Sequence, residues 1–355
     1  MTRKIVATAL TVTAVWTALA GHAQAQATDI VIKNNKEEVA GTVLSVSATA
    51  VEVKAVPKSK KVPANEIAMV RWKATAALNV AVGFERSDKL DKALEAYKKF
   101  AKSSGGASTN VKSDVEFLTA RVTLKLAGTD ASKLADAISG LDKFVKDHPQ
   151  SYRFYEAIEL LGQAQIGAQD YAAAKTTLAK LAAAPWNDLK MAAKNAEARL
   201  LLAQDNIGGA RAAFDAVAAM DAKTPNERAR KYDAMLGSAN CLLEDKKYKE
   251  AADVLEQVTA EADPEDRRVQ AEAYLRLGDS RRNLNETKKA ALAYLHVDIM
   301  FASQRRQHAE SLYRLAEVWQ VLGDTRRHAE ARETLDSEYP QSEWTKKLSQ
   351  SGAGS

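Results

Sequence analysis

The chain has 355 residues, of which 46% are hydrophobic and 27% are charged, as is typical of a folded protein. Only 16 glycines and 7 prolines occur, which excludes a collagen-like or linker-dominated chain. A single cysteine excludes an internal disulfide framework and a cysteine-rich metal site. The length favours about two domains.

The charge balance argues against a nucleic-acid partner. The formal net charge is +5, from 51 basic and 46 acidic residues. Removing Arg3 and Lys4 with an N-terminal signal leaves 49 basic residues against the same 46 acidic ones. Both signs are interleaved along the chain, as on a solvated helix surface, whereas phosphate binding needs a concentrated basic face.

The N-terminus has the pattern of a secretory signal peptide. Arg3 and Lys4 precede an apolar run from Ile5 to Ala20, and Ala23-Gln24-Ala25 is a small-x-small cleavage site. The run is short for a membrane-spanning helix, which needs about 20 residues. No cysteine near the site offers a point for lipid attachment. We predict that residues 1–25 are removed and that the mature protein is periplasmic or secreted, with an N-terminal membrane anchor as the alternative.

From Asp29 to Trp72 the hydrophobic residues alternate with a period of two, which predicts strands. The alternation changes parity between Val43 and Val46, which predicts a bulge or a sharp bend. Four or five short strands in so few residues predict a small β domain at residues 28–73. The pattern is similar to that of an SH3-like barrel.

After Trp72 the pattern becomes helical, with alanine and leucine recurring at helical spacing between short breaks. Near the C-terminus a whole segment repeats at an offset of 38 residues. Arg267-Arg268, Ala271-Glu272 and Arg276-Leu277-Gly278 return as Arg305-Arg306, Ala309-Glu310 and Arg314-Leu315-Ala316. The fold class is therefore mainly α, with helices over residues 74–348 and a flexible tail at residues 349–355.

These repeats resemble the tetratricopeptide repeat, a helix–turn–helix unit of 34 residues. Its pattern places a Leu-Gly pair in the first helix and an alanine about twelve residues later. Leu161-Gly162 with Ala174 fits this pattern, and so does Leu277-Gly278 with Ala290. The other units are marked by Ala81, Ala198 and Ala316, by Leu236-Gly237 with a loop two residues longer, and by a stretched unit from Ala120 to Ala137. The resemblance implies a right-handed α-solenoid of about seven helix pairs, in which small residues let the paired helices approach closely.

No pattern of catalytic or metal-binding residues stands out. Cys241 has no histidine motif beside it and is interpreted as a buried structural cysteine. The histidines outside the signal segment form no pair at the three- or four-residue spacing of a helical metal site. We therefore expect a non-catalytic protein with no cofactor and no metal.

The resemblance also implies where a partner binds. In this family the first helices of successive units line a concave groove that takes up peptides or partner helices. Carried onto this chain, the groove positions are Glu159, Gln163, Ile166, Leu275, Asp279, Arg282, Tyr313, Glu317 and Gln320. We expect alanine at four of them (Asp279, Arg282, Glu317 and Gln320) to leave the fold intact. The arginine doublets are expected to pair with Glu272 and Glu310.

The function predicted from these observations is an extracytoplasmic scaffold for a protein or peptide partner. The unit ends His148-Pro149-Gln150-Ser151 and Tyr339-Pro340-Gln341-Ser342 resemble those of periplasmic repeat proteins in cell-envelope assembly. The alternative is a wall- or polysaccharide-binding protein that uses the β segment as its reader. We also expect the helical array to fold without residues 28–73, because each repeat depends mainly on its neighbours.

Overall fold

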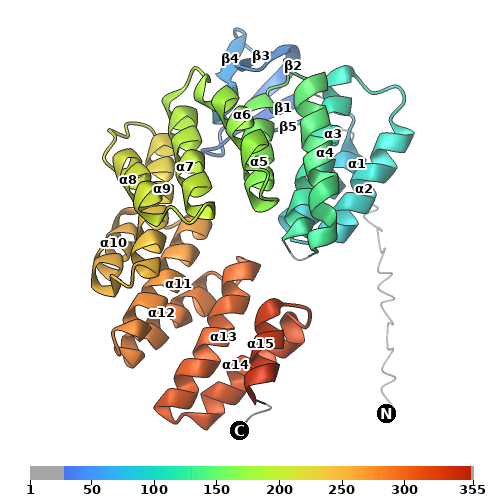
Figure 1. Ribbon diagram of the computed structural model, residues 1–355. Coiled ribbons are helices and arrows are strands. Elements are labelled where there is room, and N and C mark those ends of the chain that lie inside the picture. The colour runs from blue at the N-terminus through green and yellow to red at the C-terminus, as the bar shows by residue number, and fades with distance from the viewer. Residues whose placement is uncertain (1–27, 129, 353–355) are drawn as a thin grey trace, which may run out of the picture.

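The structure, a computed structural model, describes residues 28–128 and 130–352. The predicted signal peptide at residues 1–25 lies outside the described residues. A small β-sheet is followed by a long array of helices that curves around a central space (Figure 1). In the part of the chain that the structure describes, no helix is both long and apolar enough to cross a membrane.

The sheet has five antiparallel strands among the described residues, in the order β4-β3-β2-β1-β5. Strands β1 to β4 form a meander, and β5 returns to pair with β1. The first part of β2 pairs with β1 and the second part pairs with β3, so β2 is shared by two halves of the sheet. This strand order, with a short 3-10 helix (η1) before the last strand, is that of the predicted SH3-like arrangement. The elements are β1 (Asp29–Lys33), β2 (Glu38–Ser47), β3 (Ala50–Lys54), β4 (Lys60–Pro63), η1 (Ala64–Glu66) and β5 (Ile67–Arg71).

The predicted irregularity in the second strand is confirmed. The register between β2 and β3 shifts between Val43 and Ser45, which leaves Leu44 exposed. Just before the bulge, a Cβ atom at Gly41 would lie 2.3 Å from the backbone oxygen of Lys54. Only glycine allows the two strands to approach so closely at this bend.

Seven helix pairs follow in the described residues, and a single helix closes the array. The pairs are α1 (Ala76–Arg86) and α2 (Leu90–Ser103), α3 (Thr109–Ala127) and α4 (Leu134–Asp147), α5 (Phe154–Gly167) and α6 (Tyr171–Ala182), α7 (Asn187–Ala203) and α8 (Ile207–Ala218), α9 (Pro225–Glu244) and α10 (Tyr248–Glu261), α11 (Arg267–Asn283) and α12 (Thr287–Met300), and α13 (Arg305–Leu322) and α14 (Thr325–Glu338). The closing helix is α15 (Glu343–Gly352), which continues beyond the predicted boundary at residue 348.

The turns within the pairs share one conformation. Five of them have three residues, and the middle residue of each has a positive φ between 54° and 61°. These residues are Asp88, Gln169, Asp205, Lys246 and Asn285. The predicted stretched unit is also confirmed, because α3 and α4 are separated by a longer connection that contains the 3-10 helix η2 (Ala131–Lys133).

Small residues let the paired helices approach, as predicted. A Cβ atom at Gly162 would lie 2.7 Å from the Leu178 side chain, and one at Gly278 would lie 2.3 Å from the Tyr294 ring. The register of the unit at Gly237 was predicted wrongly: a Cβ atom there would meet Phe214 of the preceding unit, at 2.5 Å. The turn after α9 has the usual three residues, so the small residue twelve positions before Ala251 is the fully buried Ala239.

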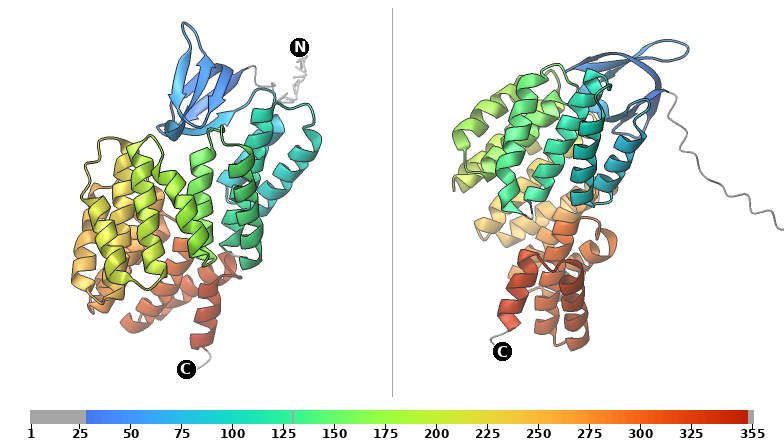
Figure 2. Two further views of the ribbon diagram at one scale, coloured as in Figure 1. Left: turned by 45° about the horizontal axis from the view of Figure 1, so that its top comes forward. Right: turned by 90° about the vertical axis from the view of Figure 1, so that its right-hand side faces the viewer.

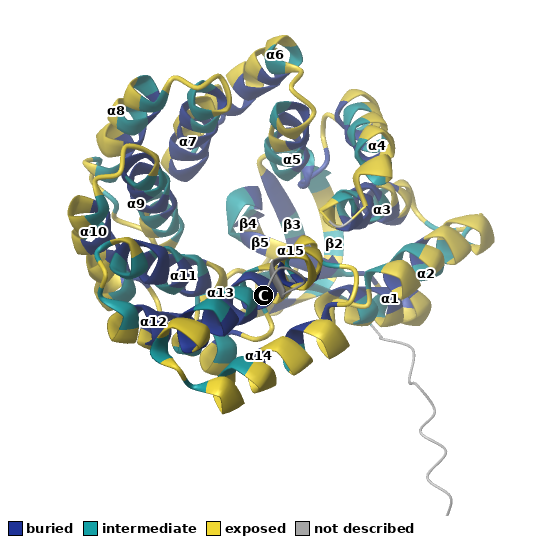
Figure 3. Ribbon diagram, turned by 60° about the horizontal axis from the view of Figure 1, so that its bottom comes forward, coloured by how far each residue is buried: buried dark blue, intermediate teal, exposed yellow. Residues whose placement is uncertain are grey.

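The array makes about one turn of a superhelix. The odd-numbered helices lie on its inside and the even-numbered ones on its outside (Figure 3). We call these the inner and outer helices. The superhelix brings the two ends of the array together. Arg305 Nε at the start of α13 lies 3.1 Å from Oδ2 of Asp88, in the loop between α1 and α2. Lys36 of the sheet also lies 3.9 Å from Glu265, between α10 and α11.

The sheet lies across one end of the array (Figure 2). Its core is continuous with that of the first helices, because Val70 and Trp72 belong to the same buried cluster as Leu78 of α1 and Val115 of α3. Trp72 Nε1 also donates to Asp114 Oδ2 at 2.9 Å. This shared core argues against the expectation that the helices fold without residues 28–73, which remains a prediction.

Candidate functional site

A large hollow of about 1260 Å³ follows the inner helices from α5 to α13. We call it the central groove. Its floor mixes amides, aliphatic side chains and charges of both signs. The uncharged side chains include Gln163, Ile166, Leu202, Asn240 and Leu243. A groove of this length and composition suits a peptide better than a small apolar ligand.

The predicted groove residues fall into two groups. Glu159, Gln163, Ile166, Asp279 and Arg282 line the central groove.

The other four residues lie elsewhere. Leu275 is fully buried in the core formed with α12 and α13, so its prediction as a groove contact is wrong. The Leu275 side chain packs against the neighbouring inner helix, α13, instead of facing the central groove. Tyr313 stacks near Trp344 of α15, with the ring centroids 5.3 Å apart, Glu317 accepts a hydrogen bond from Tyr313, and Gln320 is exposed on α13.

A ladder of ion pairs crosses the floor of the groove and joins one inner helix to another. Both guanidinium Nη atoms of Arg230 in α9 donate to the carboxylate of Glu159 in α5, at 2.7 and 2.8 Å, and so bridge past α7. Arg276 of α11 makes the same two-pronged contact with Glu310 of α13, at 3.0 Å for both bonds. Bidentate arginine–carboxylate pairs of this kind fix geometry strongly. They therefore hold the curvature of the array.

The arginine doublets do not make the predicted pairs. Arg268 pairs with Asp233, and Arg305 pairs with Asp88. Glu272 and Glu310 instead pair with Arg276, which is not a member of either doublet.

Asp279 is the most heavily used acidic residue in the groove. Its side chain accepts hydrogen bonds from Tyr294 Oη at 2.8 Å and from Arg276 Nη1 at 2.7 Å, and it lies 3.3 Å from Arg314. It is 8% exposed, and Arg282 is tied to Glu317 at 2.7 Å. Removing one partner of a buried pair leaves a charge uncompensated. The expectation that alanine at these positions leaves the fold intact assumed surface positions, and these contacts argue against it.

Two cations in the groove are free for a ligand. Among the described residues, Arg199 of α7 and the exposed Arg306 of α13 make no hydrogen bond or ion pair. Burial lowers the pKa of Arg199, although Asp233 and Glu159 nearby raise it. Sequence reasoning missed Arg199, because no groove position was carried over for the unit that contains α7. It singled out Arg306 only as part of a doublet that was expected to pair within the array.

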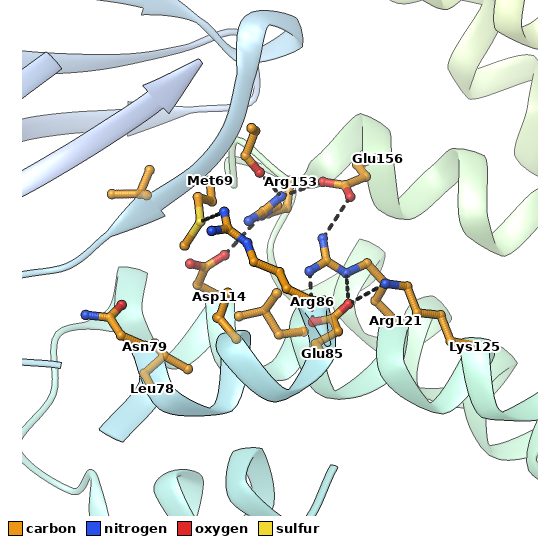
Figure 4. A pocket seen from close by; sticks show the side chains of 14 residues that line it. Met69, Leu78, Asn79, Glu85, Arg86, Asp114, Arg121, Lys125, Arg153 and Glu156 are labelled. Carbon is orange, nitrogen blue, oxygen red and sulfur yellow. Dashed lines mark hydrogen bonds and ion pairs between the residues drawn. The ribbon is translucent and has the colours of Figure 1, made fainter. Parts of the chain in front are cut away.

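A second hollow of about 390 Å³ lies between β5 and the inner helices α1, α3 and α5 (Figure 4). Most of its charges are paired with one another, since the three carboxylates Glu85, Asp114 and Glu156 each contact an arginine. Burial alone raises the pKa of Glu85, but the Arg121 guanidinium and the Lys125 ammonium beside it outweigh burial and lower that pKa to about 2. Asp114 accepts hydrogen bonds from Trp72, Tyr152 and Arg153. We interpret this cluster as a structural joint between the sheet and the helices.

Nothing in the described residues brings together three histidine, cysteine or acidic side chains that could hold a metal ion. Cys241 is fully buried, and burial raises the pKa of its thiol to about 11. A thiol protonated at neutral pH is a poor nucleophile. The interpretation of Cys241 as a structural residue is consistent with this geometry.

Comparison with known proteins identifies the repeats. The family model described as the tetratricopeptide repeat matches residues 233–263, which cover most of α9 and all of α10. A crystal structure of a tetratricopeptide repeat protein from Parabacteroides merdae superposes with a TM-score of 0.50. It is 20% identical and covers 66% of this chain and 81% of that one. Residues 233–263 therefore form a tetratricopeptide repeat, and the described helices have the fold of a tetratricopeptide repeat protein.

Two more distant solved structures are also similar. A Rap protein in complex with competence and sporulation factor is 13% identical, has a TM-score of 0.47 and covers 76% of each chain. PilF of Pseudomonas aeruginosa is 19% identical, has a TM-score of 0.42 and covers 69% of this chain and 100% of that one. Both are too distant to bear on function. No curated protein matches the sequence. Tetratricopeptide repeats serve as scaffolds for protein or peptide partners, and the fold is consistent with that role.

Proposed function

We propose that this tetratricopeptide protein is a non-catalytic scaffold that binds an extended peptide or a helix of a partner protein in its central groove. The observation that carries the proposal is the continuous hollow of about 1260 Å³ along five inner helices, from α5 to α13. Repeat solenoids use such concave surfaces to bind their partners.

The chemistry of the groove supports a peptide of mixed character. Ile166, Leu202 and Leu243 offer apolar contact, while Gln163 and Asn240 can donate to and accept from a peptide backbone. Arg199 and Arg306 are available for a carboxylate. Most of the other charges are already paired across the inner helices, so the groove is a preformed surface that needs little rearrangement on binding.

The proposal includes a place of action outside the cytoplasm. The charged start, the apolar run and the Ala23-Gln24-Ala25 site support secretion of the chain. An extracytoplasmic scaffold of this kind would serve assembly of the cell envelope. Mass analysis of protein recovered from the envelope fraction should find a mature N-terminus at or near Gln26, and intact Met1 in the membrane would contradict this.

The binding surface can be tested with two matched triple variants. The groove variant is Gln163→Ala, Asn240→Ala and Arg306→Ala, which removes no ion pair of the described residues. The control variant is Lys175→Ala, Gln257→Ala and Ser337→Ala, three exposed positions on the outer helices α6, α10 and α14. Each set changes two neutral polar residues and one cation.

Both variants should keep the wild-type circular dichroism, because exposed substitutions usually change stability by only about 0.5 kcal/mol each. Cross-linking and mass spectrometry in envelope extracts should identify a partner of the wild type. The control variant should retain that partner and the groove variant should lose it. Equal recovery by both variants would contradict binding in the groove.

A further inference from the structure

A third hollow, of about 360 Å³, lies at the seam between the β domain and the helical array. We call it the seam pocket. One wall is η1 of the sheet, and the other walls are the first turns of α5, α7 and α9. Glu159 and Arg230 line both the seam pocket and the central groove, so the two hollows adjoin each other.

Asn65 of η1 is fixed at the centre of this seam. Its backbone oxygen accepts hydrogen bonds from the side chains of Asn34 and Asn226, both at 2.9 Å. Its side-chain Nδ2 donates to Asp188 Oδ1 at 3.1 Å, which sets the orientation of the amide. In that orientation Asn65 Oδ1 is buried and has no donor. A buried acceptor without a donor is costly, so this oxygen is a position where a ligand N–H would be stabilised.

Asp188 is the second polar group of the seam pocket that a ligand could satisfy further. It is 5% exposed, and no cation forms an ion pair with it among the described residues. Burial raises its pKa, although Asn65, Arg230 and the backbone N–H groups at the start of α7 act to lower it. The neighbouring carboxylates differ, since Glu159 pairs with Arg230 and Glu156 pairs with Arg153. The seam pocket therefore contains one buried negative charge without a counterion.

Aromatic side chains line the same pocket. Tyr155 of α5 and Trp186, the residue that precedes α7, meet edge to face with ring centroids 5.8 Å apart. Both are half-buried. An aromatic wall beside a buried carboxylate suits a group that combines an aliphatic stem with a cationic, donor-only head.

We propose that the seam pocket binds a lysine or arginine side chain of the partner peptide. The charged head donates to the Asp188 carboxylate and to Asn65 Oδ1, and the methylene stem packs on Trp186 and Tyr155. Sugar hydroxyl groups fit less well, because they are acceptors as well as donors and carry no charge to compensate Asp188. The inference rests on the proposed function, since the same peptide would extend from the central groove.

The test measures the pocket with small probes rather than with the partner. Nα-acetyl-arginine amide and Nα-acetyl-lysine amide are titrated against the mature protein at constant ionic strength. Nα-acetyl-citrulline amide and Nα-acetyl-norleucine amide are the neutral counterparts, and N-acetylglucosamine is the sugar. The readout is the NMR signal of the Trp186 indole N–H, assigned with Trp186→Phe.

The cationic probes should bind about tenfold more tightly than their neutral counterparts, because hydrogen bonds to charged groups exceed neutral ones by about 1–1.5 kcal/mol. Asp188→Asn should remove this preference and still fold, since the amide oxygen can accept from Asn65. Asp136→Asn is the matched control, because Asp136 also lies in the first turn of a helix but is exposed. It should leave the preference unchanged.

Equal binding of charged and neutral probes, or a preference that survives in Asp188→Asn, would overturn the inference. Binding of N-acetylglucosamine alone would overturn it too and would assign the pocket to glycans. The binding of these probes is independent of whether the groove variant loses the partner found by cross-linking. A failure of this inference is thus distinct from a failure of the proposed function.

Discussion

Replacing Gly278 by alanine tests how closely the paired helices must approach. The new Cβ atom would lie 2.3, 2.6 and 2.7 Å from the Cε1, Cδ1 and Cζ atoms of the Tyr294 ring. These distances are far inside van der Waals contact. The ring cannot easily move away, because Tyr294 is fully buried and its Oη donates to Asp279 at 2.8 Å.

The expected cost combines two destabilising effects and one stabilising effect. Forcing an extra methyl group into a packed core costs roughly 1–3 kcal/mol. A weakened hydrogen bond from Tyr294 to the charged Asp279 adds about 1–3 kcal/mol. Alanine is the better helix former and returns about 1 kcal/mol. We therefore expect Gly278→Ala to lower the free energy of unfolding by about 1–5 kcal/mol.

Gly83→Ala is the matched control. Gly83 is also helical, but a Cβ atom there meets nothing within 4 Å. Alanine should stabilise the protein at that position by about 0.4–1 kcal/mol. Urea unfolding followed by circular dichroism at the helix band compares both variants with the wild type. A Gly278→Ala variant as stable as Gly83→Ala would refute the argument from close packing.

Two further predictions follow from the joint between the sheet and the helices. Trp72→Ala should destabilise the whole chain by about 3–5 kcal/mol through cavity formation and loss of the bond to Asp114, while Trp344→Ala on the half-exposed α15 should cost less in the same thermal melt. Because the pKa of Glu85 in the folded state is about 2, below its ordinary value of 4.5, its carboxylate stabilises the fold above pH 4.5 and loses that effect as the pH falls towards 2. This contribution is about 3 kcal/mol. Between pH 4.5 and 2 the free energy of unfolding should therefore fall less for Glu85→Gln than for the wild type. Parallel curves of unfolding free energy against pH would contradict this prediction.

The sequence predicted those parts of the fold that depend on local pattern. The change in parity at Val43 marked the bulge, and the spacing from Gly162 to Ala174 and from Gly278 to Ala290 marked the helix pairs. At Gly237 the same rule failed, because a glycine two positions away was mistaken for the true marker, Ala239. An alanine in an alanine-rich helix gives no distinct signal.

The candidate site was less predictable, because it depends on how the units stack. Nothing in the local pattern shows that Arg230 reaches Glu159 past α7, or that Leu275 points into the core. The seam pocket joins residues still farther apart, since Asn65 contacts Asp188 and Asn226, which follow it by 123 and 161 positions. Its unsatisfied oxygen and uncompensated carboxylate emerge only when the sheet is placed against the array.

The contact between Arg305 and Asp88 has a consequence for how such a chain can change in evolution. An open solenoid gains or loses repeats freely, since each unit touches only its neighbours. Here the first and last units meet after about one turn. An additional unit would drive the final helices into the first ones or displace them along the axis, and a missing unit would leave a gap beside Asp88. The repeat number is therefore constrained by ring closure, and duplications or deletions of whole units should be far less tolerated than insertions in the turns.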